Sequence, residues 1–174
     1  TTAHILVNDR MKESMVDYEE QVKKVAGVPE VLAATPFIFR QVLLTSPSGV
    51  QGIILRGIDP AREGTVTELA HNLVNGNLDD LSHSTKVVIP EKEREPNGPD
   101  TAMRPGIILG KELSMRLGAF PGDTLNVVSP VGPVTGASMT PKIRQFVVVG
   151  IFQSGMYEYD SSLAYIELGE AQKF

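Results

Sequence analysis

The amino-acid sequence predicts an α+β fold with a β-rich insertion. Short apolar segments of strand length recur through most of the 174-residue chain, and helical spacing of apolar residues is clearest near its start. A further observation is a loop of about a dozen residues between Pro130 and Pro141, flanked by two strongly apolar strands. Most hairpin loops have only ~2–5 residues. This loop is therefore either disordered or a functional element held on a rigid base.

Composition excludes several classes of protein. Hydrophobic residues make up 41% of the chain and charged residues 21%, as in an ordinary globular protein with one domain or two small subdomains. The net charge of −5 argues against a nucleic-acid partner, which requires a basic face. Cysteine is absent, which excludes disulfides and cysteine-bound metals. The histidines lack metal-ligand spacing, so no metal site is predicted at His4, His71 or His83.

We expect the chain to be a segment of a longer protein, because it does not begin with Met. Its first residues, TTAHILVND, lack the basic region of a signal peptide. No apolar run approaches the ~20 residues that a helix needs to cross a bilayer.

The N-terminal part is expected to contain a strand and an amphipathic helix. Residues 4–7 form a short apolar run, and Asn8 or Asp9 can cap the helix that follows. Gly27 and Pro29 end this helix. Its apolar face is expected to pack in the core and consists of Met11, Met15, Tyr18, Val22 and Val25.

A long hairpin follows, with its turn at residues 46–49. Its strands are expected at 31–45 and 50–58, and Asp59-Pro60 stops the second of them. Residues 67–74 are expected to form a short helix that ends at Asn75-Gly76.

A strand at 86–89 leads into a polar segment, residues 90–104. This segment has mixed charge, proline and glycine without any period, which predicts an exposed mobile loop; an interaction segment is the alternative. Residues 107–109 then enter a short helix with Leu113 and Leu117 on one face. The remaining strands are expected at 125–128, 143–152 and 162–166, and a final helix begins at residue 167.

No catalytic site is predicted. The chain has neither the GxxxxGK[ST] nor the GxGxxG loop that binds nucleotide phosphates, and it has no G-x-S-x-G nucleophile motif. Its densest polar cluster contains Glu158 and Asp160, which would share one face of an extended segment. Such a pair is suited to acid/base catalysis, but a turn packed by Tyr157 and Tyr159 is the favoured interpretation. No cofactor is predicted.

Residues 144–172, RQFVVVGIFQSGMYEYDSSLAYIELGEAQ, closely resemble the periplasmic domain of the LolC/LolE family. These proteins are the membrane subunits of the lipoprotein-releasing ABC transporter of Gram-negative bacteria. Similar segments occur in the same order elsewhere and cover nearly the whole chain except residues 90–104. They are TTAHILV, GVPEVLAATPFIFRQVLL, GIILRGIDP and PGIILGKELSMRLGAFPGDTLNVVSP.

The resemblance implies two subdomains. Residues 1–75 and 160–174 would form a porter-like α/β subdomain, truncated at its C-terminal end, and residues 76–159 an inserted β-rich subdomain called the Sabre. It also implies a location on the periplasmic side of the inner membrane and no enzymatic activity, because the family's ATPase is a separate cytoplasmic subunit.

The resemblance gives the long loop a function. In LolC-type members a protruding hairpin, the Hook, recruits the periplasmic chaperone LolA, and residues 130–141 occupy its place. A basic patch lies beside the Hook in the family, and Lys142 and Arg144 match part of it, whereas Asn126 and Ile143 occupy neighbouring places without charge. An inert hairpin, as in LolE-type members, is the alternative. The candidate partner-binding residues of the loop are Pro130, Val131, Val134, Met139 and Pro141.

The implied function is mechanical. The chain would couple ATP-driven movement to extraction of a lipoprotein from the inner membrane and its transfer to LolA. Its implied partners are the chaperone, the lipoprotein, a second permease subunit and the ATPase subunit. The first alternative is the equivalent domain of another ABC system, of the MacB efflux type or the FtsX type. A stand-alone β-barrel hydrolase is the second.

Overall fold

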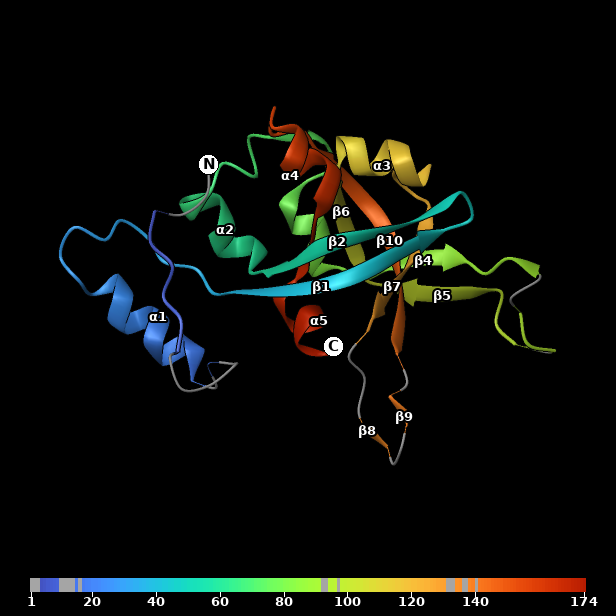
Figure 1. Cartoon of the computed structure of the whole chain (residues 1–174), viewed down its shortest axis with the longest axis horizontal. Coiled ribbons are helices and arrows are strands. Elements are labelled where there is room, and N and C mark those ends of the chain that lie inside the picture. Colours follow the sequence, from blue (N-terminus) through green and yellow to red (C-terminus); the bar gives the residue numbers. More distant parts are fainter. Residues whose placement is uncertain are drawn as a thin grey trace.

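A computed structural model shows a mixed α/β fold built around a closed sheet (Figure 1). Within the described part of the chain, the main sheet has seven strands in the order β3-β10-β6-β11-β2-β1-β7, and β7 also pairs with β10, which closes it. The strands are β1 Phe37–Ser46, β2 Gly49–Ile58, β3 Leu73–Asn75, β6 Gly106–Gly110, β7 Thr124–Ser129, β10 Lys142–Phe152 and β11 Leu163–Glu167. The structure describes residues 4–9, 15, 17–91, 94–96, 98–130, 134–135, 138–139 and 141–174.

Helices and two small hairpins surround this sheet. The helices are α1 Tyr18–Ala26, α2 Pro60–Val66, α3 Lys111–Leu117, α4 Tyr157–Ser162 and α5 Leu168–Gln172, with a 3₁₀ turn, η1, at Leu78–Ser82. The small hairpins pair β4 Thr85–Val88 with β5 Thr101–Arg104, and β8 Val134–Thr135 with β9 Ser138–Met139. No described helix is long and apolar enough to cross a membrane.

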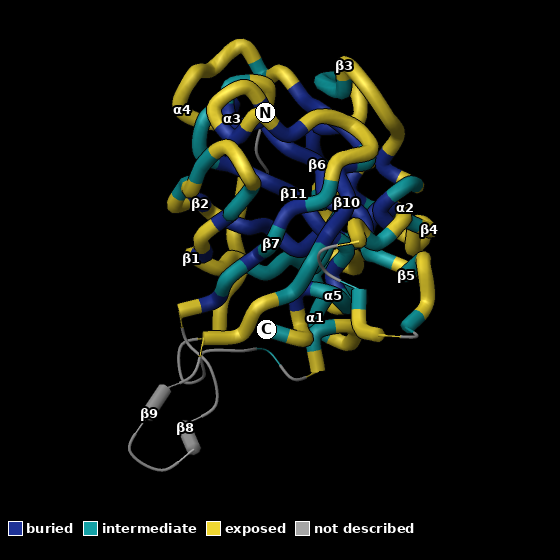
Figure 2. Tube along the Cα trace, turned by 90° about the vertical axis from the view of Figure 1, so that its right-hand side faces the viewer, coloured by how far each residue is buried: buried dark blue, intermediate teal, exposed yellow. Residues whose placement is uncertain are grey.

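The main core lies inside the closed sheet. Strand β7 shows why: Leu125, Val127 and Ser129 are buried, while the residues between them are half-buried, because side chains of a strand alternate between its faces. Phe146 on β10 is fully buried in the same cluster. The buried strands run through the centre of the molecule in Figure 2.

A second apolar cluster lies outside the closed sheet. Leu69, Leu78 and Leu81, from the segment between α2 and β4, pack against Ile58 and Phe152 of the sheet. This layer buries part of the outer face, so β2 and β11 carry buried residues on both sides.

The N-terminal part differs from the prediction. Residues 4–7 are not a strand: they pair with no described strand, and Ile5 is 75% exposed. The helix α1 begins only at Tyr18, and Met15 precedes it, while Met11 lies outside the described residues. The apolar face of α1 is half-buried and none of its residues reaches the core.

The prediction of a helix at residues 67–74 is wrong. The helix instead begins at Pro60, where the Asp59 side chain accepts a hydrogen bond from the Ala61 N–H at 3.1 Å. Asp59-Pro60 was interpreted as a strand stop, but the same pair is a preferred helix start. Leu73 then enters the short strand β3, which pairs with β10.

The predicted loop at residues 90–104 is wrong at its end, because Thr101–Arg104 forms β5 and pairs with β4. Arg94 supports this hairpin: its Nε donates to the Ile89 carbonyl at 2.8 Å, and its guanidinium pairs with Asp100 at 2.8 Å. The helix predicted after residues 107–109 is confirmed as α3 and ends at Gly118, whose φ of 58° is left-handed.

Both predicted subdomain boundaries cut across the closed sheet. The sheet takes β1, β2, β3 and β11 from residues assigned to the porter-like part, and β6, β7 and β10 from residues assigned to the Sabre-like part. Hydrogen bonding between these strands makes residues 37–58 and 163–167 part of the same unit as the β-rich middle.

Candidate partner-binding site

The long loop stands on a rigid base formed by β7 and β10. These strands pair from Thr124 with Val147 to Ser129 with Lys142, directly next to the loop. Within the loop, β8 and β9 pair Val134 with Met139 and Thr135 with Ser138. Figure 1 shows these two short strands beyond the ends of β7 and β10, away from the closed sheet.

Four of the five residues predicted to bind a partner through this loop lie within the described part of the chain and form two pairs. Pro130 and Pro141 are exposed where the loop leaves the sheet. Val134 and Met139 are brought opposite each other by the backbone pairing of β8 and β9. Val131 lies outside the described residues.

The predicted basic patch is already engaged within the chain. Arg144 is half-buried; one of its terminal nitrogens donates to the Glu170 carbonyl at 3.1 Å and another pairs with the Glu170 carboxylate. Its guanidinium carbon lies 5.5 Å from the ring centroids of both Phe146 and Phe174. The Lys142 ammonium donates to the Lys173 carbonyl. These two cations therefore tie β10 to α5 and its end.

The inner-face position of Arg144 could have been recognised from strand alternation. Arg144 lies two residues before Phe146, which is a core residue, so both side chains share the inner face of β10. An arginine at the end of an inner face needs a partner close by, and Glu170 on α5 supplies it.

Burial raises the pKa of Glu170, but hydrogen bonds and charge from Lys173 and Arg144 outweigh it, so the pKa lies below its ordinary value of 4.5. A lowered carboxyl pKa stabilises the folded state above the unfolded pKa, and this contribution is lost as the pH falls through the folded pKa.

We expect the hydrogen-exchange protection of α5 to fall selectively below pH ~4.5 relative to α3 in the same sample. In Glu170→Gln, α5 should be less protected at neutral pH, with no further selective loss in acid. Parallel changes in both helices would contradict this role.

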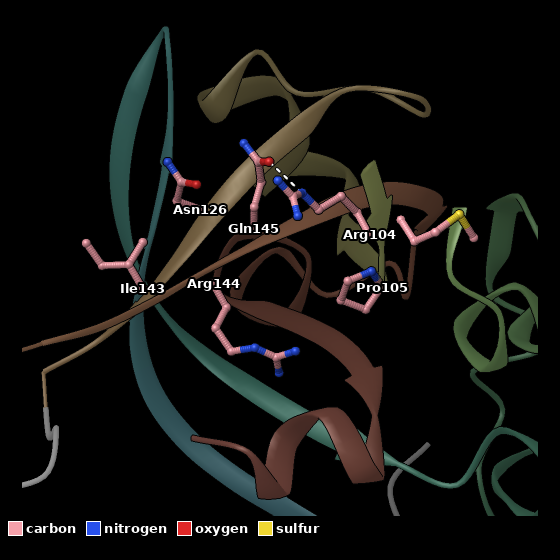
Figure 3. Close-up of a pocket in the computed structure, with 7 residues that line it drawn as sticks. Arg104, Pro105, Asn126, Ile143, Arg144 and Gln145 are labelled. Carbon is pink, nitrogen blue, oxygen red and sulfur yellow. Dashed lines mark hydrogen bonds between the residues drawn. The ribbon is translucent and has the colours of Figure 1, made fainter. Parts of the chain in front are cut away.

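An open hollow of about 490 Å³ lies beside the base of the loop. Arg104 reaches it from β5, and its Nε donates to Gln145 Oε1 at 2.7 Å (Figure 3). Figure 3 also shows Arg144 pointing to the opposite side of β10 from Gln145. Sequence reasoning missed Arg104 because it lies in the segment predicted as a mobile loop. The lining residues are Met103, Arg104, Pro105, Asn126, Ile143, Arg144 and Gln145.

The candidate acid/base pair is separated. Residues 157–160 begin helix α4 instead of a turn, and helical residues two apart do not face each other. Glu158 is exposed, whereas Asp160 is 4% exposed and accepts from the backbone N–H and the Oγ of Ser154, both at 2.8 Å. Asp160 thus braces the turn before α4. The described residues contain no group of three or more potential metal ligands.

The fold is shared with a transporter domain. The extracellular domain of the noncanonic ABC-type transporter YknZ from Gram-positive bacteria superposes with a TM-score of 0.54 at 15% identity, covering 89% of this chain and 64% of that one. No protein-family model matches the chain.

Sequence relatives identify the family. The chain is 34% identical over 142 residues to the lipoprotein-releasing system transmembrane protein LolC of Neisseria meningitidis serogroup B, covering 82% of the chain and 30% of that relative. It is 31% identical over 159 residues to the LolC protein of Xylella fastidiosa, covering 91% of the chain and 34% of that relative. The chain belongs to the LolC/LolE family and spans about a third of the length of these relatives.

Proposed function

We propose that this chain is the periplasmic domain of a lipoprotein-releasing ABC permease subunit and that residues 130–141 form its Hook, which binds a LolA-type chaperone. One observation carries the proposal. In a member of the LolC/LolE family, the strands β7 and β10 of the closed sheet hold a loop whose own strands, β8 and β9, pair beyond them. The relatives are named LolC, which favours a LolC-like Hook over the inert hairpin of a LolE-like subunit.

The closed sheet is a suitable base for such a hairpin. Its inner face is filled by fully buried residues such as Phe146, so forces on one strand are shared by the whole sheet. A chaperone that carries acyl chains needs an apolar cavity, and Val134 and Met139 are the residues of the hairpin suited to enter it. Burying each is worth roughly 1.5–3 kcal/mol before the cost of ordering.

The remaining steps need the other parts of the transporter. A separate ATPase subunit drives movement of the permease subunits, this domain transmits the movement on the periplasmic side, and the lipoprotein passes from the inner membrane to the chaperone on the Hook. We assign the closed sheet to the Sabre-like part. We assign the N-terminal arm with α1 to the porter-like part. No residue of α1 is buried, and its Glu19 pairs with Arg62 of α2 at 3.1 Å.

The Hook is tested by titrating this chain with its cognate LolA-type chaperone. Met139→Asp should weaken binding at least about tenfold, because a carboxylate cannot enter an apolar cavity without a large desolvation cost. Met115→Asp is the matched control, since Met115 is 50% exposed on α3 at the other end of the closed sheet (Figure 1). Both variants should melt close to the unmodified chain.

Two outcomes would overturn the Hook. The unmodified chain could show no binding, which would favour a LolE-like subunit with an inert hairpin. Alternatively, Met139→Asp and Met115→Asp could bind equally well, which would place the docking surface elsewhere.

A further inference from the structure

The positive charges at the base of the Hook are not equivalent. Arg144 pairs with Glu170 of α5, and Lys142 donates to the Lys173 carbonyl directly after α5. Arg104 is different, because among the described residues no carboxylate lies within ion-pair distance of it, and its one hydrogen bond is to the neutral Gln145 amide.

Arg104 is nevertheless held in position. It lies at the end of β5, where its register partner is Thr85 of β4, and the chain continues through Pro105 directly into β6 of the closed sheet. The hydrogen bond from Nε to Gln145 Oε1 joins it to β10, three residues after the first residue of that strand. Nε is thereby used, while the two terminal nitrogens of the guanidinium have no partner among the described residues.

The surroundings of Arg104 are those of a protein-binding surface. Met103 is 59% exposed and Ile143 is 60% exposed, and both line the same hollow as Arg104. Ile143 pairs with Val128 in the β7–β10 ladder, the second pair from the Hook. Arginine is one of the residue types that contribute most to the binding energy of protein interfaces, and it does so when apolar side chains surround it.

We propose that Arg104 is a charged anchor of the chaperone-binding surface and that it takes a carboxylate side chain of the chaperone while the Hook is bound. This inference rests on the proposed function, because the hollow adjoins the base of the Hook. A guanidinium with two free terminal nitrogens matches a carboxylate in a two-point contact. Met103 and Ile143 keep water from this contact, which strengthens it.

The test compares Arg104→Gln with Arg116→Gln in the same titration with the chaperone. Both changes remove one guanidinium and make the chain more negative by one charge, but Arg116 lies on α3, far from the Hook (Figure 1). Arg104→Gln should weaken binding about tenfold, whereas Arg116→Gln should change it less than about twofold. Arg104→Lys keeps the charge without the fork and should fall between them. The dependence of affinity on salt concentration should also be shallower for Arg104→Gln than for the unmodified chain.

The outcomes separate this inference from the Hook itself. If Met139→Asp weakens binding while Arg104→Gln and Arg116→Gln bind equally well, the Hook stands and the Arg104 anchor is overturned. If the unmodified chain does not bind the chaperone, both are overturned. If Arg104→Gln alone weakens binding and flattens the salt dependence, the carboxylate contact is supported.

Discussion

Replacing Arg56 by Met is expected to destabilise the folded chain by about 3–5 kcal/mol near neutral pH. Arg56 on β2 is 5% exposed and Glu63 on α2 is fully buried, and their charged groups lie 3.4 Å apart. Removing the arginine leaves a buried carboxylate whose only remaining hydrogen-bond donor among the described residues is the Thr67 Oγ, at 3.1 Å from Oε1. Its other oxygen, Oε2, has no partner among the described residues.

Arg56 also packs against aromatic rings, which the Met side chain can only partly replace. Its guanidinium carbon lies 5.1 Å from the ring centroid of Phe37 and 5.5 Å from that of Phe39. On β11, burial raises the pKa of Tyr165 to about 12, so this side chain stays neutral beside Arg56 and Glu63.

The pH dependence of this variant has a definite sign. Burial raises the pKa of Glu63 above 4.5, and Arg56 opposes that rise. Without Arg56 the folded-state pKa moves higher still. A raised carboxyl pKa favours the folded state below the unfolded pKa, and this contribution is lost as the pH rises through the folded pKa. The destabilisation of Arg56→Met should therefore be largest near neutral pH. It should shrink as the pH falls through the raised folded-state pKa of Glu63, which lies above 4.5, because Glu63 then becomes protonated.

Urea denaturation of four chains measures this effect: the unmodified chain, Arg56→Met, Glu63→Leu and the double variant. The double variant Arg56→Met/Glu63→Leu removes both charges and should be more stable than Arg56→Met alone near neutral pH, because no buried charge is left unpaired. An equal loss of stability at neutral and acidic pH, or a double variant as unstable as the sum of the single changes, would show that packing and not charge determines the cost.

The sequence predicts pairing between neighbouring segments of the chain but not pairing between distant ones. The β1–β2 hairpin was predicted from two apolar runs around a turn, and the structure confirms it with the pairs Phe37 with Ile58 to Ser46 with Gly49. Such local pairing is visible in sequence. Closure of the sheet was not predicted, because it depends on β7 meeting β1 through Leu43 with Val128, two segments with no local relation.

The errors at the candidate site have a common cause. Residues 101–104 lack an apolar period and were predicted as loop, yet they form β5 because β4 pairs with them and Arg94 supports the turn. Arg104 was therefore not predicted as a site residue, because it lies in that segment. The length of the 130–141 loop was visible without any tertiary information, whereas the engagement of Arg144 with Glu170 was not, because α5 reaches β10 only through the folded sheet.

Replacing Gly110 by Ala is expected to cost about 3 kcal/mol of folding stability. Gly110 ends β6 at the start of α3, with an ordinary extended backbone of φ −64° and ψ 148°. The cost comes from space and not from backbone conformation. An added Cβ would lie 2.2 Å from the Asp160 carbonyl oxygen and 2.8 Å from its Cα. These are backbone atoms, so no side-chain rotation relieves the clash, and α4 must move away from β6.

The movement should be visible at Asp160, because its carboxylate holds the Ser154 N–H and Oγ before α4. Amides around Ser154 should exchange faster in Gly110→Ala than in the unmodified chain.

The matched control is Gly27→Ala at the end of α1. Gly27 has φ −82°, and an added Cβ would make ordinary contacts of 3.5 Å with the Lys23 and Lys24 carbonyls. The control should change stability by less than about 0.5 kcal/mol, or slightly raise it by restricting the unfolded chain. Urea midpoints with an unchanged slope measure both effects; equal midpoints for the two variants would mean that β6 and α4 separate without cost.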